Sequence, residues 1–350
     1  MTLINDTLSD SSNDTNQSEA AWCITNIAAG THEQTATIIH CTPLLISYLS
    51  IENTVLQEQC TWALLNIAID CPEYKEMLIA QGIVHPLIRL FSSTSSSVTT
   101  FNCCCLIVSL ITTSQHQQQL VGMGLIACLK ERITRFQSAS SIDTLCELLW
   151  LLNDIVSMDT TMLTLHSVVN QGYFITLEGV LLDDTPAHIV LPIIRTLGLL
   201  FTDTRCASYI MHNNNTSLKS LLAKLIARLS NTTTTGQPPR IIKEIIYLLS
   251  NISAIDPTPV DGHSNNISMI LVQAGCLPMF DSCLYQLDPL TAPKVKVELI
   301  YLIHNLSLDP SVRDTIKQYF KHIVIAVSAV DSQLLSFPES IRLNIQSLSM

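Results

Sequence analysis

The fold is decided by two near-copies, EAAWCITNIAAGTHEQT (residues 19–35) and QEQCTWALLNIAIDCPEYKEMLIAQG (residues 57–82). In each copy a Trp precedes an Asn by four positions, as Trp22 with Asn26 and Trp62 with Asn66, and the pair recurs after 40 residues. Residues at i and i+4 lie on one face of a helix. A period of about 40 residues that carries such a pair indicates a helical repeat array rather than a domain with a single core.

Five further segments align on the Trp and Asn positions, which we call the first and second slots. Each segment predicts a helix of the same kind, which we call an anchor helix. Their slots hold Cys105/Ser109, Trp150/Asp154, Arg195/Leu199, Tyr247/Asn251 and Tyr301/Asn305. A second signature, rich in Gly or Pro, follows in HCTPLLISYL (40–49), QGIVHPLIRLF (81–91), GMGLIACL (122–129), QGYFITLEGVLL (171–182) and QAGCLPMFDSCL (273–284). Gly ends helices and Pro fits a first turn, so each repeat is expected to contain a second helix.

These patterns predict the boundaries of the array. Residues 1–17 lack apolar periodicity and are expected to be disordered, residues 18–335 to form about seven repeats, and residues 336–350 to be a C-terminal cap or tail. The polar stretches 231–239 and 256–266 are expected to be surface loops. Because each repeat touches only its neighbours, such loops leave one continuous right-handed superhelix.

Composition excludes several classes of protein. The chain is 47% hydrophobic and 13% charged, with no basic and apolar leader in its first 20 residues and no uninterrupted apolar run long enough for a membrane span. Its 12 Cys fall mostly within apolar runs, which favours buried thiols in a reducing compartment. A formal net charge of −11 without clustered Lys and Arg disfavours nucleic acid and favours a basic partner.

Nothing in the sequence indicates an enzyme. Nucleotide-binding glycine motifs, a nucleophile elbow, a zinc-protease helix and zinc-spaced Cys pairs are all absent. The scattered histidines, such as His85, His166 and His304, fall at repeat positions where a structural role is expected. We therefore expect no catalytic residue, no metal and no cofactor.

The two best copies resemble armadillo repeats, and within them importin alpha, the adaptor family that binds nuclear localisation signals. The similarity covers roughly residues 18–328, and HIVLPIIRTLGLLFTDT (188–204) resembles that family's anomalous repeat, in which Arg replaces Trp. The resemblance implies an all-α solenoid in the cytoplasm and nucleus that carries the Lys/Arg-rich signal peptides of cargo proteins in an extended conformation. It places the peptide on Trp22, Asn26, Gly30, Thr35, Gln59, Trp62, Asn66 and Asp70, with the last carboxylate receiving the critical lysine.

The residue types suit that chemistry. A carboxamide both donates and accepts, so a row of Asn can pair with a peptide backbone whatever its side chains. Trp faces take the aliphatic stems of Lys or Arg with a cation–π attraction of about 0.5–2 kcal/mol, and carboxylates receive the charged ends. We call the pair of slots on one anchor helix a rung. Cys105/Ser109 in the third rung and Leu199 in the fifth lack these groups, so both rungs are expected to bind a peptide weakly. A weaker secondary peptide site is expected at Trp150, Arg195, Tyr247, Asn251, Tyr301 and Asn305.

Two alternatives stay open. The family recruits its beta-type carrier through a basic segment, but residues 1–18 contain no Lys or Arg, so carrier binding is expected only if such a segment is missing from this sequence. A pseudo-adaptor that competes for cargo without delivering it would also fit. The eroded rungs favour a different alternative, an armadillo scaffold for another kind of protein partner.

Overall fold

The structure is a computed structural model that describes residues 2–10, 12–137, 141–230, 239–255, 267–278, 280, 292–320 and 337–349. Contacts between Cα atoms divide the chain into two compact units, Met1–Gln171 and Gly172–Met350, and each is described by itself. Among the described residues, all regular structure is helical. The all-α fold class is therefore confirmed, whereas a single continuous superhelix stays a prediction.

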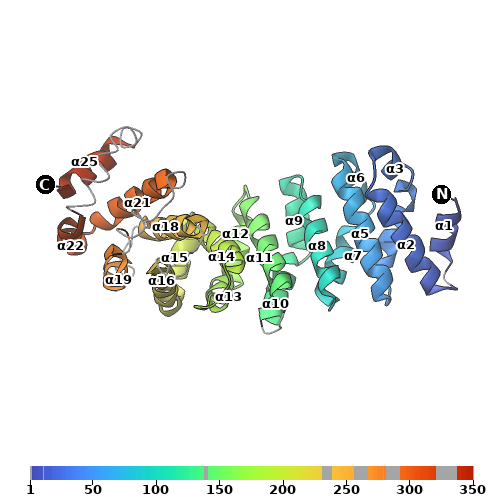
Figure 1. The fold of residues 1–350 in the computed structure, drawn as a ribbon, viewed down its shortest axis with the longest axis horizontal. Helices are drawn as coiled ribbons and strands as arrows, with labels where there is room; N and C mark the ends of the chain where they lie inside the picture. The colour runs from blue at the N-terminus through green and yellow to red at the C-terminus, as the bar shows by residue number, and fades with distance from the viewer. Residues whose placement is uncertain are drawn as a thin grey trace. The chain divides into compact units, whose positions relative to one another are not determined.

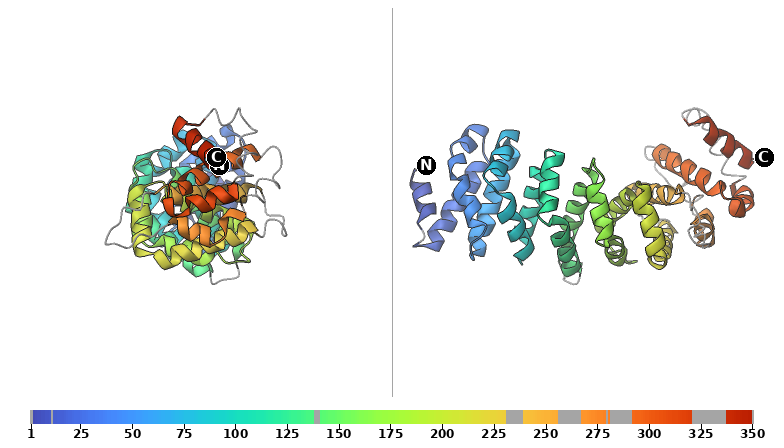
Figure 2. Two further views of the ribbon diagram at one scale, coloured as in Figure 1. Left: turned by 90° about the vertical axis from the view of Figure 1, so that its left-hand side faces the viewer. Right: turned by 180° about the vertical axis from the view of Figure 1, so that it is seen from behind.

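All seven predicted anchor helices are present. The first unit contains α2 (Asp14–Ala28), α5 (Thr54–Asp70), α8 (Ser97–Leu110) and α11 (Ile142–Ser157), and the second contains α14 (Ala187–Leu200), α18 (Pro239–Ser253) and α21 (Ala292–Ser307). Within each unit, every anchor helix contacts the next one along the chain. Figure 1 shows α2, α5, α8 and α11 side by side, and the same order runs from blue to green in Figure 2.

Two further helices follow most anchor helices and complete the repeat. The first is short: α3 (His32–Ala36), α6 (Pro72–Ala80), α9 (Ser114–Gly122), α12 (Leu163–Asn170), α15 (Thr204–Asn213), α19 (Ile267–Gln273) and α22 (Pro310–Phe320). The second helices are α4 (Thr42–Tyr48), which follows the 3-10 turn η1 (Ile39–Cys41), α7 (Val84–Ser93), α10 (Leu125–Gln137), α13 (Tyr173–Val180) and α16 (Asn215–Ser230).

Glycines make the turn between the short and the second helix. Gly82, Gly124, Gly172 and Gly275 have φ angles of 84°, 89°, 73° and 86°. This left-handed conformation places the Cβ of any other L-residue too close to the backbone, so glycine is strongly favoured. The second sequence signature is thus confirmed at these four turns, each of which joins two helical segments without a long loop.

The core lies between the anchor helices and the second helices that cover them. In α5, Cys60, Ala63, Leu64 and Ile67 are fully buried, whereas Trp62 on the same helix is 43% exposed. The helix therefore buries most of its circumference and leaves a strip outside. The 11 described cysteines are all free thiols, and seven of them are buried, as the sequence predicted.

A buried arginine fastens successive second helices in each unit. Arg132 on α10 donates to the Thr94 carbonyl (2.8 Å) and to the Thr100 hydroxyl, and its guanidinium lies 5.1 Å from the centre of the Phe91 ring. In the second unit, Arg228 on α16 donates to the carbonyls of the turn at residues 182–185. Each arginine donates to carbonyls just after the second helix of the preceding repeat, where the helix itself no longer supplies N–H partners.

The N-terminal segment differs from its prediction. Residues 2–9 form α1 (Thr2–Ser9) rather than a disordered stretch, and α2 begins at Asp14, before the predicted boundary. Leu8 is fully buried, and its carbonyl accepts bonds from the Tyr48 hydroxyl (2.6 Å) and from Gln17 Nε2 (3.0 Å). Because these partners are remote or polar, local apolar periodicity gave no sign of them.

At the other end, residues 339–349 form α25 (Glu339–Ser349), which packs on α21 and α22 as a cap would. The predicted loop at 256–266 lies outside the described residues, and so does the loop at 231–239 except Pro239, which begins α18. Among the described residues no single helix is long and apolar enough to cross a membrane; α14 and α15 pass only as a pair bent by 106°.

The glycine turns generate a matched test. Gly124→Ala should lower the free energy of unfolding by about 1–2 kcal/mol, because alanine would have to adopt a left-handed φ. Gly122→Ala, two residues earlier at the end of α9, should be neutral or stabilise by about 0.5 kcal/mol, because its Cβ meets no atom within 4 Å and its φ is not positive. Urea unfolding followed by circular dichroism measures both; equal effects would contradict a conformational role for Gly124.

Candidate functional site

The first two anchor helices present the predicted slots to solvent. Trp22 on α2 is 50% exposed and Trp62 on α5 is 43% exposed, so each indole keeps an open face. Asn26 is exposed and Asn66 is half-buried beside them. Both helices begin at an asparagine cap, since Asn13 and Asn53 accept from the backbone N–H three residues on. The caps fix where each helix starts, and burial of the apolar side chains leaves the two Trp residues on the exposed side.

The slot asparagines also connect neighbouring anchor helices. Asn66 Nδ2 donates to the Thr25 carbonyl on α2 (3.1 Å), and Asn251 Nδ2 on α18 donates to the Gly198 carbonyl on α14 (3.2 Å). Asn305 Nδ2 on α21 donates to the Ser250 carbonyl on α18 (3.1 Å). In all three cases the acceptor precedes the second slot of the previous repeat by one residue. Among the described residues, Asn66 and Asn251 thus use one N–H and retain a second N–H and Oδ1, whereas Asn305 Nδ2 also donates to the Ser253 hydroxyl (3.2 Å) and retains only Oδ1.

Gly30 and Thr35, two of the predicted lysine contacts, have structural roles within the protein itself. A Cβ at Gly30 would lie 2.1 Å from Gln34 Oε1, the atom that accepts from the Thr31 N–H in the capping box of α3. Thr35 is fully buried, with its hydroxyl within 3.2 Å of the Thr31 carbonyl. Both residues shape the turn after α2. Their predicted contact with a ligand stays a prediction.

Gln59 and Asp70 lie on α5, at the two ends of the strip that carries Trp62 and Asn66. Gln59 Oε1 is enclosed and has no hydrogen-bond partner among the described residues. Asp70 is 12% exposed at its side chain, and its Oδ2 lies 2.6 Å from Nδ1 of His32 on α3. The carboxylate that should receive a lysine is thus already paired with an imidazole.

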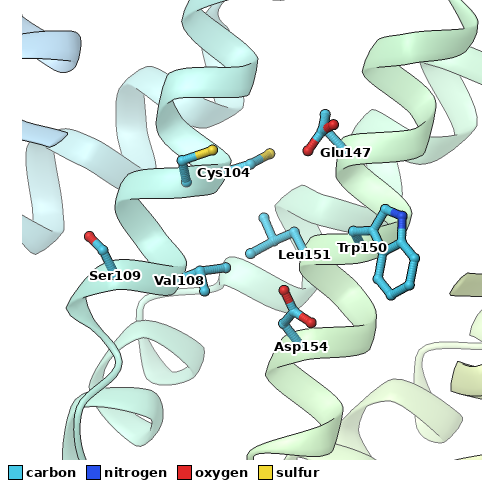
Figure 3. A pocket seen from close by; sticks show the side chains of 8 residues that line it. Cys104, Val108, Ser109, Glu147, Trp150, Leu151 and Asp154 are labelled. Carbon is cyan, nitrogen blue, oxygen red and sulfur yellow. The ribbon is translucent and has the colours of Figure 1, made fainter. Parts of the chain in front are cut away.

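The third and fourth anchor helices form a pocket instead of a ladder rung. It has a volume of about 300 Å³ and is lined by Cys104, Cys105, Val108, Ser109, Glu147, Trp150, Leu151 and Asp154. Figure 3 shows the two carboxylates on α11, one on each side of Leu151, with the thiol of Cys104 across the opening. The small side chains of Cys105 and Ser109 stand where the first two rungs have Trp and Asn.

The electrostatics of this pocket suit a cation. Burial raises the pKa of Glu147, with smaller contributions from Asp143 and Asp154, and burial alone raises the pKa of Asp154. Neither side-chain carboxylate has a hydrogen bond or an ion pair with another described residue. Half-buried carboxylates without a counter-charge favour an incoming cation, and the apolar walls with Trp150 suit an aliphatic stem.

The secondary-site residues have other contacts. Arg195 on α14 donates through Nη2 and Nε to one oxygen of Glu244 on α18, at 2.8 and 3.1 Å. The Tyr301 ring on α21 lies 5.1 Å from the Phe337 ring at a tilt of 53°. Trp150 belongs to the first unit, and the others belong to the second. The ion pair and the covered ring leave less free surface at these rungs than the sequence suggested.

Four acids that were not predicted as site residues lie at a constant distance before the first slots. Glu19, Glu147, Glu244 and Glu298 each precede a first slot by three residues, where Gln59 stands in the second repeat. In a helix, residues three apart lie on neighbouring positions of one face. Burial raises the pKa of Glu298 as it does that of Glu147. Reading the slot alignment three positions upstream would have revealed these carboxylates.

One group of potential metal ligands is present beside Asp70. Single ligand atoms of His32, Asp70 and Cys71 lie within 4.8 Å of one another. Burial raises the pKa of the Cys71 thiol, helped by the carboxylates of Glu73 and Asp70, and it is the thiolate that binds metals. The imidazole and the carboxylate satisfy each other, so we interpret them as an ion pair and assign no metal site.

Comparison with known proteins identifies the type of repeat that these helices form. Residues 31–69, from the short helix α3 to the end of α5, match the armadillo/beta-catenin-like repeat. Importin subunit alpha-9 of Arabidopsis thaliana is 26% identical over 245 residues, which are 67% of this chain and 44% of that protein. The chain is an armadillo-repeat protein distantly related to importin alpha. A probable importin subunit alpha-A of Dictyostelium discoideum is 42% identical over 77 residues, 21% of this chain and 14% of that one.

Solved structures support the fold of this armadillo-repeat protein. The crystal structure of one engineered protein aligns with a TM-score of 0.67 and 16% identity over 99% of this chain and 87% of that chain. A second engineered protein aligns with a TM-score of 0.56 and 19% identity over 71% of this chain and 95% of that one. This armadillo-repeat protein spans less than half of the length of the importin alpha relatives that it matches.

The asparagine bonds generate a prediction for this armadillo-repeat protein. Asn66→Ala should lower the free energy of unfolding by about 1 kcal/mol, because it leaves a bond between two anchor helices unmade. Asn26→Ala is the matched control, for which we expect a loss of less than about 0.5 kcal/mol. Among the described residues, Asn26 Nδ2 bonds only to the Trp22 carbonyl of its own helix, at an exposed position. Urea unfolding of the two variants measures the difference; equal losses would contradict the inter-helix role.

Proposed function

We propose that the face of α2 and α5 binds Lys/Arg-rich peptides in an extended conformation. The observation that carries this proposal is the pair of half-exposed indoles, Trp22 and Trp62, on consecutive anchor helices, each followed four residues later by an asparagine. Asp70 lies on the same strip of α5, four residues beyond Asn66. Indole face, carboxamide and carboxylate are the three groups needed for the stem, the backbone and the charge of a basic residue.

The asparagines are able to take a peptide without losing their internal bonds. Asn66 spends one N–H on the Thr25 carbonyl, which leaves the other N–H for a peptide carbonyl and Oδ1 for a peptide N–H. The internal bond also restricts the rotation of the side chain. A carboxamide that is already oriented loses less entropy when the peptide binds, which favours affinity.

Charge supports a basic ligand over an acidic one. The formal net charge is −11, and the acids three residues before the first slots place negative charge on several of the anchor helices. The pocket beside Trp150 adds Glu147 and Asp154 without a counter-charge from a described residue. Opposite charge on the ligand steers encounter and stabilises the complex, most strongly at low salt.

The cellular role that we propose is that of an importin-alpha-like adaptor. Its cargo would be proteins with nuclear localisation signals, and it would work in both the cytoplasm and the nucleus. The relationship to the importin alpha proteins of Arabidopsis and Dictyostelium supports this role, but only over part of their length. Carrier binding and delivery to the nucleus are therefore separate steps to be tested.

A second candidate function is a scaffold for another protein partner, or an adaptor that retains cargo without delivering it. It is favoured by the missing carboxamides at Ser109 and Leu199 and by the Arg195–Glu244 ion pair, which occupies an acid that a peptide would need. The two candidates differ in what they require of Asp70. Only the basic-peptide function depends on its charge.

Charge reversal tests the main proposal. Asp70→Lys should weaken the binding of a fluorescent Lys/Arg-rich peptide by at least about tenfold, because a charge-assisted bond of about 1.5–3 kcal/mol is replaced by repulsion. Glu131→Lys makes the same charge change at an exposed position of α10 and should alter Kd by less than about twofold, since distant exposed charges are screened. Fluorescence anisotropy gives both constants. Wild-type binding no tighter than millimolar, or an unchanged Kd in Asp70→Lys, would refute the proposal.

The pocket beside Trp150 should extend the peptide site. Anchor helices pack about 10 Å apart and an extended chain advances about 3.4 Å per residue, so about three residues cover one step between helices. Glu147→Gln should therefore weaken a peptide of about ten basic residues severalfold and leave one of about five residues, held at α2 and α5, unchanged. Glu131→Gln should change neither. Equal effects of Glu147→Gln on both peptide lengths would show that the pocket is not part of the site.

A further inference from the structure

His32 occupies the carboxylate that the proposed ligand needs. It is the first residue of α3, and its Nδ1 lies 2.6 Å from Oδ2 of Asp70, the last residue of α5. The imidazole is 61% exposed, whereas the carboxylate beneath it is only 12% exposed. A mostly exposed imidazole thus lies on a carboxylate that is itself largely enclosed.

The imidazole is also held from the side. Its ring stacks on the Tyr74 ring of α6, with centroids 5.7 Å apart and an interplanar angle of 18°. The position of His32 is therefore defined by two elements, the end of α5 and the first turn of α6. Stacking and a charge-assisted bond together make a specific contact rather than a chance approach of a surface side chain.

Every charged group that faces this imidazole favours its cationic form. The bond and the charge of Asp70 raise the pKa of His32, and Glu33 on α3 and Glu73 on α6 raise it further. Cys71, whose thiol lies within 4.8 Å of the imidazole, and Tyr74, whose ring stacks on it, each have a raised pKa, so both remain neutral near pH 7. Lys75 and Glu76 follow on α6 and are not among the groups that shift the pKa of His32. No lysine or arginine of the described residues contributes to the shift.

We propose that His32 is an internal competitor for Asp70: a basic peptide reaches this carboxylate only by displacing the imidazole, and it therefore binds more tightly above neutral pH than below it. This inference rests on the proposed peptide-binding function. His32 would then help to determine ligand specificity, because a ligand cation has to bind Asp70 more tightly than the imidazolium does.

The direction of the pH effect follows from linkage. In the free protein Asp70 keeps the pKa of His32 above its ordinary value; when a peptide ammonium takes Asp70 and adds a positive charge nearby, that pKa must fall. Between the two pKa values, binding releases a proton, so affinity rises with pH, by up to about tenfold per unit, and levels off above the free-state value. Glu33 and Glu73 have lowered pKa values and stay ionised throughout this range.

A pH series on three proteins tests the inference. Anisotropy titrations of a labelled Lys/Arg-rich peptide at about pH 6, 7 and 8, across the range where histidine titrates, should show the wild-type Kd falling by about tenfold or more. His32→Ser should bind at least as tightly as the wild type at every pH and with a nearly constant Kd. His40→Ser, which removes another exposed histidine of the same unit, should follow the wild type.

Each other outcome has a definite meaning. Wild type and His32→Ser with the same pH dependence, or weaker binding of His32→Ser throughout, would overturn the competitor while the proposed function stands. Failure of all three proteins to bind at any pH would overturn the proposed function and the competitor with it. A proton NMR titration of the His32 ring with and without peptide gives a readout that is independent of folding differences between variants: its pKa should fall on binding, and an unchanged pKa would contradict displacement.

Discussion

Burial of each anchor helix between its neighbours is the constraint on which the rest of each unit depends. An anchor helix such as α5 contacts α2 on one side, α8 on the other and α4 from the covering layer. Most of its apolar side chains are buried, although Val55, Trp62 and Ile69 are exposed. Trp62, Asn66 and Asp70 form a strip at i, i+4 and i+8 that is not part of the core. Residues on that strip are free to change without emptying the core, which is why Trp62 and Cys105 stand at equivalent positions of equally well-formed helices.

The strip is nevertheless not independent of the fold. Asn66, Asn251 and Asn305 each donate to a carbonyl of the preceding anchor helix, so a side chain that suits a peptide backbone also connects consecutive repeats. Where the asparagine is replaced, by Ser109, Asp154 or Leu199, the helices still stack. An inter-helix hydrogen bond contributes about 1 kcal/mol, which is small beside the burial of several leucines and isoleucines per helix. The carboxamide therefore strengthens the stack without being required for it.

The features that could be predicted from the sequence are those that each repeat carries within its own segment. The seven anchor helices and the glycine turns follow from local motifs that recur at a period of about 40 residues or more, and the structure has them at those positions. Three contacts about one repeat apart were not predicted: the His32 side chain with Asp70, the Tyr48 hydroxyl with the Leu8 carbonyl, and the Arg195 side chain with Glu244, separated by 38, 40 and 49 positions. Such pairs leave no pattern in either local stretch. Only the three-dimensional structure brings the two members of each pair together.

Three acids illustrate how neighbours alter one chemical group. Asp70 is paired with an imidazole, Glu244 with a guanidinium, and Glu147 with no described residue, although all three lie on anchor helices. A guanidinium stays charged at any physiological pH and holds its carboxylate permanently, whereas an imidazole can lose its charge and its hold. A carboxylate without a partner attracts any cation, but half-burial makes its ionised form costly until one arrives. The three carboxylates should therefore differ in their availability to a basic ligand, although they occupy similar positions on their anchor helices. Whether a carboxylate can bind a ligand thus depends on the side chain that contacts it from a neighbouring helix.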